Sequence, residues 1–103
     1  MKESSVSDKV TKCVQEALRS TNELVSDDKR VDWDSSSVLL GRCAQLDSLG
    51  LLNFLTFCEE ELASEFNSDT DLFAILDIEN IEELSIADVL KRTIDHFKGG
   101  IAS

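Results

Sequence analysis

Apolar residues recur at intervals of three and four positions near both ends of the chain, which is the pattern of an amphipathic helix. Near the N-terminus this spacing predicts a helix over about 7–24, where Ser5 and Asp8 form a start signal of the S-x-x-D type. Near the C-terminus it predicts a helix that begins behind the cap residue Ser85 and is terminated by the glycine pair 99–100. Each helix should bury its apolar side.

A third long helix is expected in the middle of the chain, from Asp47 or Ser48 to about Phe66. Asp47 is a suitable N-cap, because its side-chain oxygen can accept from the unpaired N–H groups of a first helical turn. The first half of this helix, residues 49–58, is apolar on nearly all sides. Such a helix must be buried on most faces or must present one face to another molecule.

The connections between these helices differ in length. Residues 25–46 form a long connection, and a connection of this length is unusual inside a compact domain and often functional. A loop over 67–71 and a short helical segment around residues 75–81 precede the last helix. The chain has no proline, four glycines and little strand-like alternation. We therefore expect an all-α fold, a four-helix bundle with three main helices and one short helix.

The length of 103 residues suits one domain over 1–103, with flexible ends at about 1–5 and 99–103. The formal net charge is −11, and no basic residue occurs between Arg42 and Lys91. This charge argues against nucleic acid or an anionic membrane as the partner and favours a protein with a basic surface. The interval contains twelve acidic residues, namely Asp47, Glu59, Glu60, Glu61, Glu65, Asp69, Asp71, Asp77, Glu79, Glu82, Glu83 and Asp88.

We expect neither a secretory signal nor a membrane-spanning segment. The N-terminus is polar, and the longest apolar-rich stretch, residues 49–58, is shorter than the roughly 20 residues of a spanning helix. The three cysteines at positions 13, 43 and 58 are widely spaced and only one histidine is present. Neither a disulfide framework nor a metal site is therefore expected, and reduced thiols favour a cytoplasmic protein.

The tripeptide Asp47-Ser48-Leu49 opens the middle helix, directly after the long connection, and a glutamate cluster begins eleven residues after the serine. In this arrangement the sequence resembles the acyl carrier protein family, small four-helix proteins that bear a phosphopantetheine arm. The resemblance covers roughly residues 7–97. Its most specific parts are Leu39-Leu40-Gly41, the run from Leu46 to Gly50, and the run from Glu59 to Leu62.

The resemblance implies a role for each matching residue. Ser48 is the serine that would accept 4'-phosphopantetheine from coenzyme A, and Asp47 is the acidic neighbour that caps the helix and helps the modifying enzyme engage. Leu49 would flank the arm. A phosphodiester at this place also makes physical sense, because a helix N-terminus offers free amides and a favourable dipole to an anion. The residues implied in recognition of partner enzymes are Leu52, Thr56, Glu59 and Glu60.

The sequence departs from the fatty-acid carriers at Gly50 and Asn53, where that branch usually has acidic residues. The form D-S-x-G is more similar to carriers of specialised pathways, including D-alanyl and other aminoacyl carriers. We therefore expect a monomeric, stand-alone carrier that is not itself an enzyme. Its partners would be a phosphopantetheinyl transferase, a loading enzyme and downstream synthases with basic surfaces. The cargo stays open among fatty acyl, D-alanyl, other aminoacyl and polyketide groups.

Other interpretations of these residues were weighed. Ser48 can be a plain helix-capping serine in an acidic helical adaptor that carries no prosthetic group. A hydrolase is disfavoured, because no G-x-S-x-G sequence surrounds Ser48 and the one histidine is His96. A calcium loop that begins at Asn67 or Asp69 lacks the glycine and glutamate that an EF-hand needs. The carrier and the adaptor therefore remain the two functional hypotheses.

Overall fold

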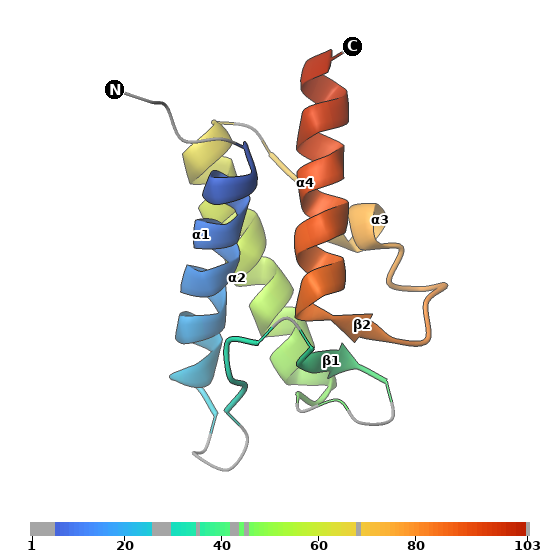
Figure 1. Cartoon of the computed structure of the whole chain (residues 1–103). Coiled ribbons are helices and arrows are strands. Elements are labelled where there is room, and N and C mark those ends of the chain that lie inside the picture. The colour runs from blue at the N-terminus through green and yellow to red at the C-terminus, as the bar shows by residue number, and fades with distance from the viewer. Residues whose placement is uncertain are drawn as a thin grey trace.

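The computed structural model describes residues 6–25, 30–34, 36–41, 44, 46–67 and 69–102. In this part of the chain, three long helices and one short helix accompany a small two-stranded sheet (Figure 1). In chain order the elements are α1 (Val6–Asn22), β1 (Val38–Leu40), α2 (Ser48–Phe66), α3 (Leu72–Leu76), β2 (Leu84–Ser85) and α4 (Ile86–Ala102). The fold is thus mainly helical, as the periodicity predicts.

The three long helices form the body of the molecule. Helices α1 and α2 lie side by side and run in opposite directions, while α4 packs against α1 and carries α3 on its other side (Figure 1). Helix α1 buries the stripe of apolar residues that the sequence predicts, including Val10, Val14 and Ala17. Its expected start signal at Ser5 lies outside the described residues. Helix α2 has the expected bounds, with Asp47 as its N-cap.

The start of α4 confirms the capping box. The Ser85 hydroxyl accepts from the Asp88 N–H at 3.2 Å, and the Asp88 carboxylate accepts from the Ser85 N–H at 3.0 Å. The predicted end is wrong, because the helix continues through residues 99–100 to Ala102. Glycine ends a helix when it takes a left-handed conformation, and among the described glycines only Gly41 has a positive φ. Of the ends expected to be flexible, 1–5 and Ser103 lie outside the described residues.

The expectation of an all-α fold is wrong in one respect, since β1 pairs with β2 in an antiparallel sheet. Val38 lies opposite Ser85, and the N–H of Ile86 donates to the carbonyl of Ser37 at 3.0 Å. The buried side chain of Leu39 anchors the strand in the core. The long connection has backbone groups that need partners, and the segment before α4 supplies them. The short helix is also misplaced in the prediction: it spans 72–76, because Asp77 adopts a left-handed φ of 55° and ends it.

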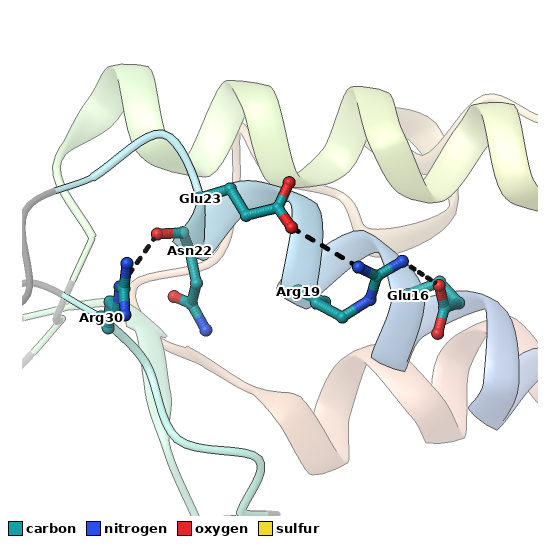
Figure 2. Close-up of polar contacts among 5 residues, drawn as sticks. All are labelled: Glu16, Arg19, Asn22, Glu23 and Arg30. Carbon is teal, nitrogen blue, oxygen red and sulfur yellow. Dashed lines mark hydrogen bonds and ion pairs between the residues drawn. The ribbon is translucent and has the colours of Figure 1, made fainter.

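The junction after α1 is held by one amide side chain. The Asn22 amide donates to the carbonyl of Val31 and accepts from its N–H, both at 2.9 Å. The Arg30 guanidinium donates to the Asn22 carbonyl, and Arg19 pairs with Glu16 and Glu23 on the exposed side of the helix (Figure 2). These contacts tie Arg30 and Val31 to Asn22 at the end of α1.

Candidate functional site

The start of α2 has the geometry of a well-capped helix. The Asp47 backbone is extended, and its carboxylate accepts from the N–H of Gly50 at 2.7 Å. The Asp47 carbonyl accepts the N–H of Leu51 at 2.9 Å, which closes the first helical turn. Ser48 is therefore the first residue of α2, at a helix start beside a loop. The structure thus confirms Asp47 as the N-cap of the middle helix and Ser48 as its first residue.

Gly50 lies close to both the capping residue of α2 and a buried leucine. A Cβ atom at this position would lie 3.2 Å from the Asp47 carboxylate and 3.3 Å from the side chain of Leu46. Leu46 is buried beneath the first turn of α2. Glycine leaves the space in which the capping residue and Leu46 fold back against the helix.

A cavity of about 600 Å³ lies beside the start of α2. Its walls come from β1 and the residues after it, from the first two turns of α2, and from α3 and the turn behind it. The lining is mainly aliphatic and aromatic, and Asp47 is its one charged side chain among the described residues. The lining residues are Leu39, Leu40, Gly41, Ala44, Leu46, Asp47, Leu51, Leu52, Phe73 and Ile78.

Gly41 shapes this wall of the cavity. Its φ of 129° is a conformation that other residues rarely adopt, and a Cβ there would lie 3.1 Å from the Glu83 side chain and 3.3 Å from the carbonyl of Glu82. The glycine thus lets the chain turn after β1 while it passes close to the segment before β2. This is a physical reason for the Leu39-Leu40-Gly41 run that the resemblance singled out.

Four of the predicted contact residues lie along one exposed side of α2, which we call the α2 stripe. Leu49 and Leu52 are exposed by 65% and 47%, although both are large apolar side chains. Thr56 and Glu60 follow at intervals of four and are also exposed. The Thr56 hydroxyl donates to the Leu52 carbonyl at 2.9 Å, which satisfies that group within the helix. The α2 stripe is thus apolar near the start of the helix and acidic farther on.

Glu59 does not belong to the α2 stripe. It is half-buried, and its carboxylate accepts from the N–H of Leu72, the first residue of α3, at 2.8 Å. At the other end of α3, the Arg92 guanidinium donates to the Leu76 carbonyl at 3.0 Å. Sequence reasoning missed these two contacts, since they join residues 13 and 16 positions apart with no recognisable spacing.

Phe73 was also missed by the sequence analysis, although it lines the cavity from α3. It is 36% exposed, which is unusual for a phenylalanine next to a helix start. The signal that could have found it is the run Leu72-Phe73, which directly follows the capping residue Asp71. Apolar side chains of α2 and α3 thus line the cavity together with those of β1.

Cys13, Cys58 and His96 do not line the cavity beside the start of α2. Burial, together with the nearby carboxylates of Glu65 and Glu61, raises the pKa of Cys13 to about 11. Burial also raises the pKa of Cys58 well above its ordinary value, and this residue lies in the core as expected. Cys43 lies outside the described residues. His96 stands in the C-terminal half of α4, away from the end of the bundle at which α2 begins (Figure 1).

Two searches of the described residues returned nothing. No helix among them is long and apolar enough to cross a membrane. No three of their His, Cys, Asp and Glu side chains are grouped so as to hold a metal ion. Comparisons with models of known families, with curated proteins and with solved structures gave no match.

Proposed function

We propose that this chain is a stand-alone acyl carrier protein, with an acyl group held as a thioester on a 4'-phosphopantetheine arm attached to Ser48. The observation that carries the proposal is the helix start: Ser48 is the first residue of α2, directly behind the capping residue Asp47, which lines a mainly apolar cavity. A carrier needs an attachment residue that partner enzymes can reach, together with a shelter for the reactive cargo. A serine at a helix start beside a mainly apolar cavity supports this proposal.

The residues present fit the prosthetic group. The first turn of a helix has N–H groups without helical acceptors, and Asp47 occupies only the one of Gly50. The remaining amides and the positive end of the helix dipole favour a phosphodiester at Ser48. When bound, the group supplies a thiol at the end of a long arm. Leu49, exposed beside Ser48, would flank that arm.

The lining of the cavity favours an aliphatic acyl cargo over an aminoacyl one. Each methylene group buried there contributes about 0.8 kcal/mol, so a chain of four or more methylenes gains about 3 kcal/mol. A D-alanyl group has one methyl group to bury, and its ammonium would lose water in exchange for Asp47 alone among the described lining residues. The proposed cargo is therefore a fatty or polyketide-like acyl chain, although the D-S-x-G form is more similar to aminoacyl carriers.

The α2 stripe suits transient docking by several enzymes. Its apolar part, Leu49 and Leu52, can enter a shallow apolar pocket, while Glu60 and the acidic residues beyond it attract a basic rim. Electrostatic attraction of this kind speeds association more than it tightens binding, which suits a carrier that must leave again. The proposed partners are a phosphopantetheinyl transferase, a loading enzyme and synthases with basic surfaces.

An acidic helical adaptor remains the second candidate, because exposed leucines beside an acidic surface also fit a permanent partner. The carrier and the adaptor predict different effects of a substitution at Ser48. An adaptor needs no modified serine, so Ser48→Ala would leave its binding intact. A carrier with the same substitution folds normally and loses its function.

The first experiment is intact-mass measurement after incubation with coenzyme A, magnesium and a permissive phosphopantetheinyl transferase. We expect the wild-type chain to gain one phosphopantetheine. Ser48→Ala should gain none, while the matched variant Ser36→Ala, which changes an exposed loop serine, should gain one. A folded wild-type chain that gains nothing beside an active transferase would refute the carrier and favour the adaptor.

A second experiment tests the cargo. The same transferase can load the chain with octanoyl, acetyl or alanyl forms of the arm from the matching coenzyme A thioesters. We expect the octanoyl form to melt at a higher temperature than the other two, because only its chain fills the apolar cavity. Equal melting temperatures for all three forms would contradict an acyl-binding role for the cavity.

A further inference from the structure

A groove outside the candidate site lies between α1 and the segment that follows it. It has a volume of about 340 Å³ and is lined by residues of α1 between Gln15 and Asn22 and by Val31 and Trp33. We call it the Trp33 groove, and it shares no lining residue with the cavity beside the start of α2. Its apolar lining consists of two buried side chains, Leu18 and Val31, and of Trp33, which is 40% exposed. This volume is near the lower limit of roughly 300–1,000 Å³ for ligand pockets, so the groove suits a single side chain.

The backbone on both sides of Trp33 is held by hydrogen bonds. Before it, the N–H and the carbonyl of Val31 are both bonded to the side-chain amide of Asn22. After it, the Asp34 carboxylate accepts from the N–H and from the hydroxyl of Ser36, both at 2.9 Å. Trp33 is therefore exposed on a preorganised segment, and a contact residue held in this way loses little conformational freedom when a partner binds.

The indole of Trp33 is available to another molecule. Within the described part of the chain, it contacts no cation and no second ring, and its N–H donates no hydrogen bond. The nearest described cation in the sequence, Arg30, donates instead to the carbonyl of Asn22 (Figure 2). Tryptophan is among the residues that most often dominate the binding energy of a protein interface. An exposed, preorganised indole beside a groove is therefore a suitable contact point.

The charge beside the Trp33 groove is negative. The one cation among its described lining residues, Arg19, pairs with Glu16 at 2.6 Å and with Glu23 at 3.4 Å, so one cation faces two carboxylates (Figure 2). Asp32 and Asp34, on either side of the tryptophan in the sequence, are exposed and form no ion pair with a described residue. A cation that approached the indole would therefore be attracted by carboxylates that this chain does not neutralise.

We propose that the Trp33 groove is a second docking surface, on which an arginine side chain of a basic partner protein stacks against the indole. A guanidinium is planar and has five N–H donors, so it can lie on the ring and also pair with a neighbouring carboxylate. The compact ammonium of lysine matches this combination less well. Because a carrier and an adaptor both need a protein partner, the proposal does not depend on modification of Ser48.

Nuclear magnetic resonance tests the surface directly, because Trp33 is the only tryptophan in the chain and its indole N–H gives a single signal. Octa-arginine is added to the isotope-labelled, unmodified chain, and octa-lysine serves as a control of equal charge. We expect octa-arginine to shift the indole signal at a lower concentration than octa-lysine does. An unmoved indole signal, or equal effects of the two peptides, would overturn the proposal. A neutral peptide of alternating serine and leucine that acts at a lower concentration than octa-arginine would also overturn it, because the groove would then suit an apolar partner.

Variants separate this surface from the α2 stripe. In Trp33→Leu, the octa-arginine concentration that half-saturates the shift of the Val31 amide should rise about two- to fivefold, as expected for one lost cation–π contact at an exposed site. Asp32→Asn should raise this concentration as well. The matched variant Leu24→Ala changes another exposed apolar side chain and should leave the concentration unchanged, as should Glu60→Gln on α2. An unchanged concentration in either Trp33→Leu or Asp32→Asn would contradict the proposed arginine contact.

Discussion

Thr93 gives the sharpest test of how this fold is stabilised. Its side chain is fully buried on α4, and its hydroxyl has no hydrogen-bond partner among the described residues. Thr21 on α1 is equally buried, but its hydroxyl donates to the carbonyl of Ala17 at 2.8 Å. The two threonines thus share residue type, helical setting and burial, and differ in whether the hydroxyl is satisfied. Valine has nearly the same shape as threonine and lacks that group.

The expected magnitudes follow from this difference. A buried hydroxyl without a partner costs about 1–3 kcal/mol, so Thr93→Val should raise the free energy of unfolding by about 1–2 kcal/mol. In a domain of this size, each kcal/mol raises the melting temperature by about 4–8 °C. Thr21→Val removes a satisfied hydroxyl, and the Ala17 carbonyl keeps the helix's own N–H donor. That variant should therefore be unchanged or less stable by up to about 1 kcal/mol.

Urea denaturation followed by helical circular dichroism measures both changes, with the wild-type chain as reference. The slope of the transition should be the same in all three proteins, so that the midpoints report stability directly. If Thr93→Val has a lower free energy of unfolding than the wild-type chain, the Thr93 hydroxyl makes a favourable interaction and the reasoning is wrong. A thermal melt of the same proteins provides an independent check of the order.

Three further predictions concern the loop junction, the helix cap and a buried thiol. Asn22→Ala should lower the free energy of unfolding in urea by about 2 kcal/mol, since it removes both hydrogen bonds to the buried residue Val31. The control Arg19→Ala should leave this free energy nearly unchanged, because the ion pairs of Arg19 are exposed. Asp47→Ala should lower the free energy of unfolding by about 1 kcal/mol in the same assay, and Asp47→Asn should lower it much less, because asparagine also caps a helix. A transferase that needs the charge of Asp47 would nevertheless modify both variants slowly. Burial raises the pKa of Cys13 from 9.0 to about 11, so the unfolded chain loses the thiol proton at a lower pH than the folded chain does. The free energy of unfolding should therefore fall as the pH rises from about 9 to about 11. In Cys13→Ala, urea denaturation across the same pH range should show a smaller fall.

The long helices could be predicted because local signals determine them. The spacing of apolar residues defines the buried stripe of α1, and the pairs around Asp47 and Ser85 mark helix starts through contacts only three residues apart. The sheet could not be predicted in the same way. Strands of two and three residues are too short for their alternation to be recognised, and their pairing joins Val38 to Ser85 across nearly half of the chain.

In the candidate site, too, some residues could be predicted from local sequence patterns and others could not. Asp47 and Ser48 belong to a local pattern, and the α2 stripe follows from helical spacing once α2 is known. The role of Glu59 could not be predicted, because a partner 13 residues away depends on how the loop after α2 returns. The end of α4 shows the opposite limit: glycines 99–100 suggest a stop, yet glycine is also compatible with a right-handed helix.

The unusual composition of α2 is explained by the two kinds of surface that it serves. Phe54, Leu55, Cys58 and Leu62 are completely buried and hold α2 against the other helices. Leu49 and Leu52 lie outside the core, where they contribute little to folding and expose apolar surface to water. The glutamates farther along α2, from Glu59 to Glu65, repel one another and weaken the fold further. Polar residues at positions 49 and 52 would expose less apolar surface to water, so the two exposed leucines support the proposal that this end of α2 contacts another molecule.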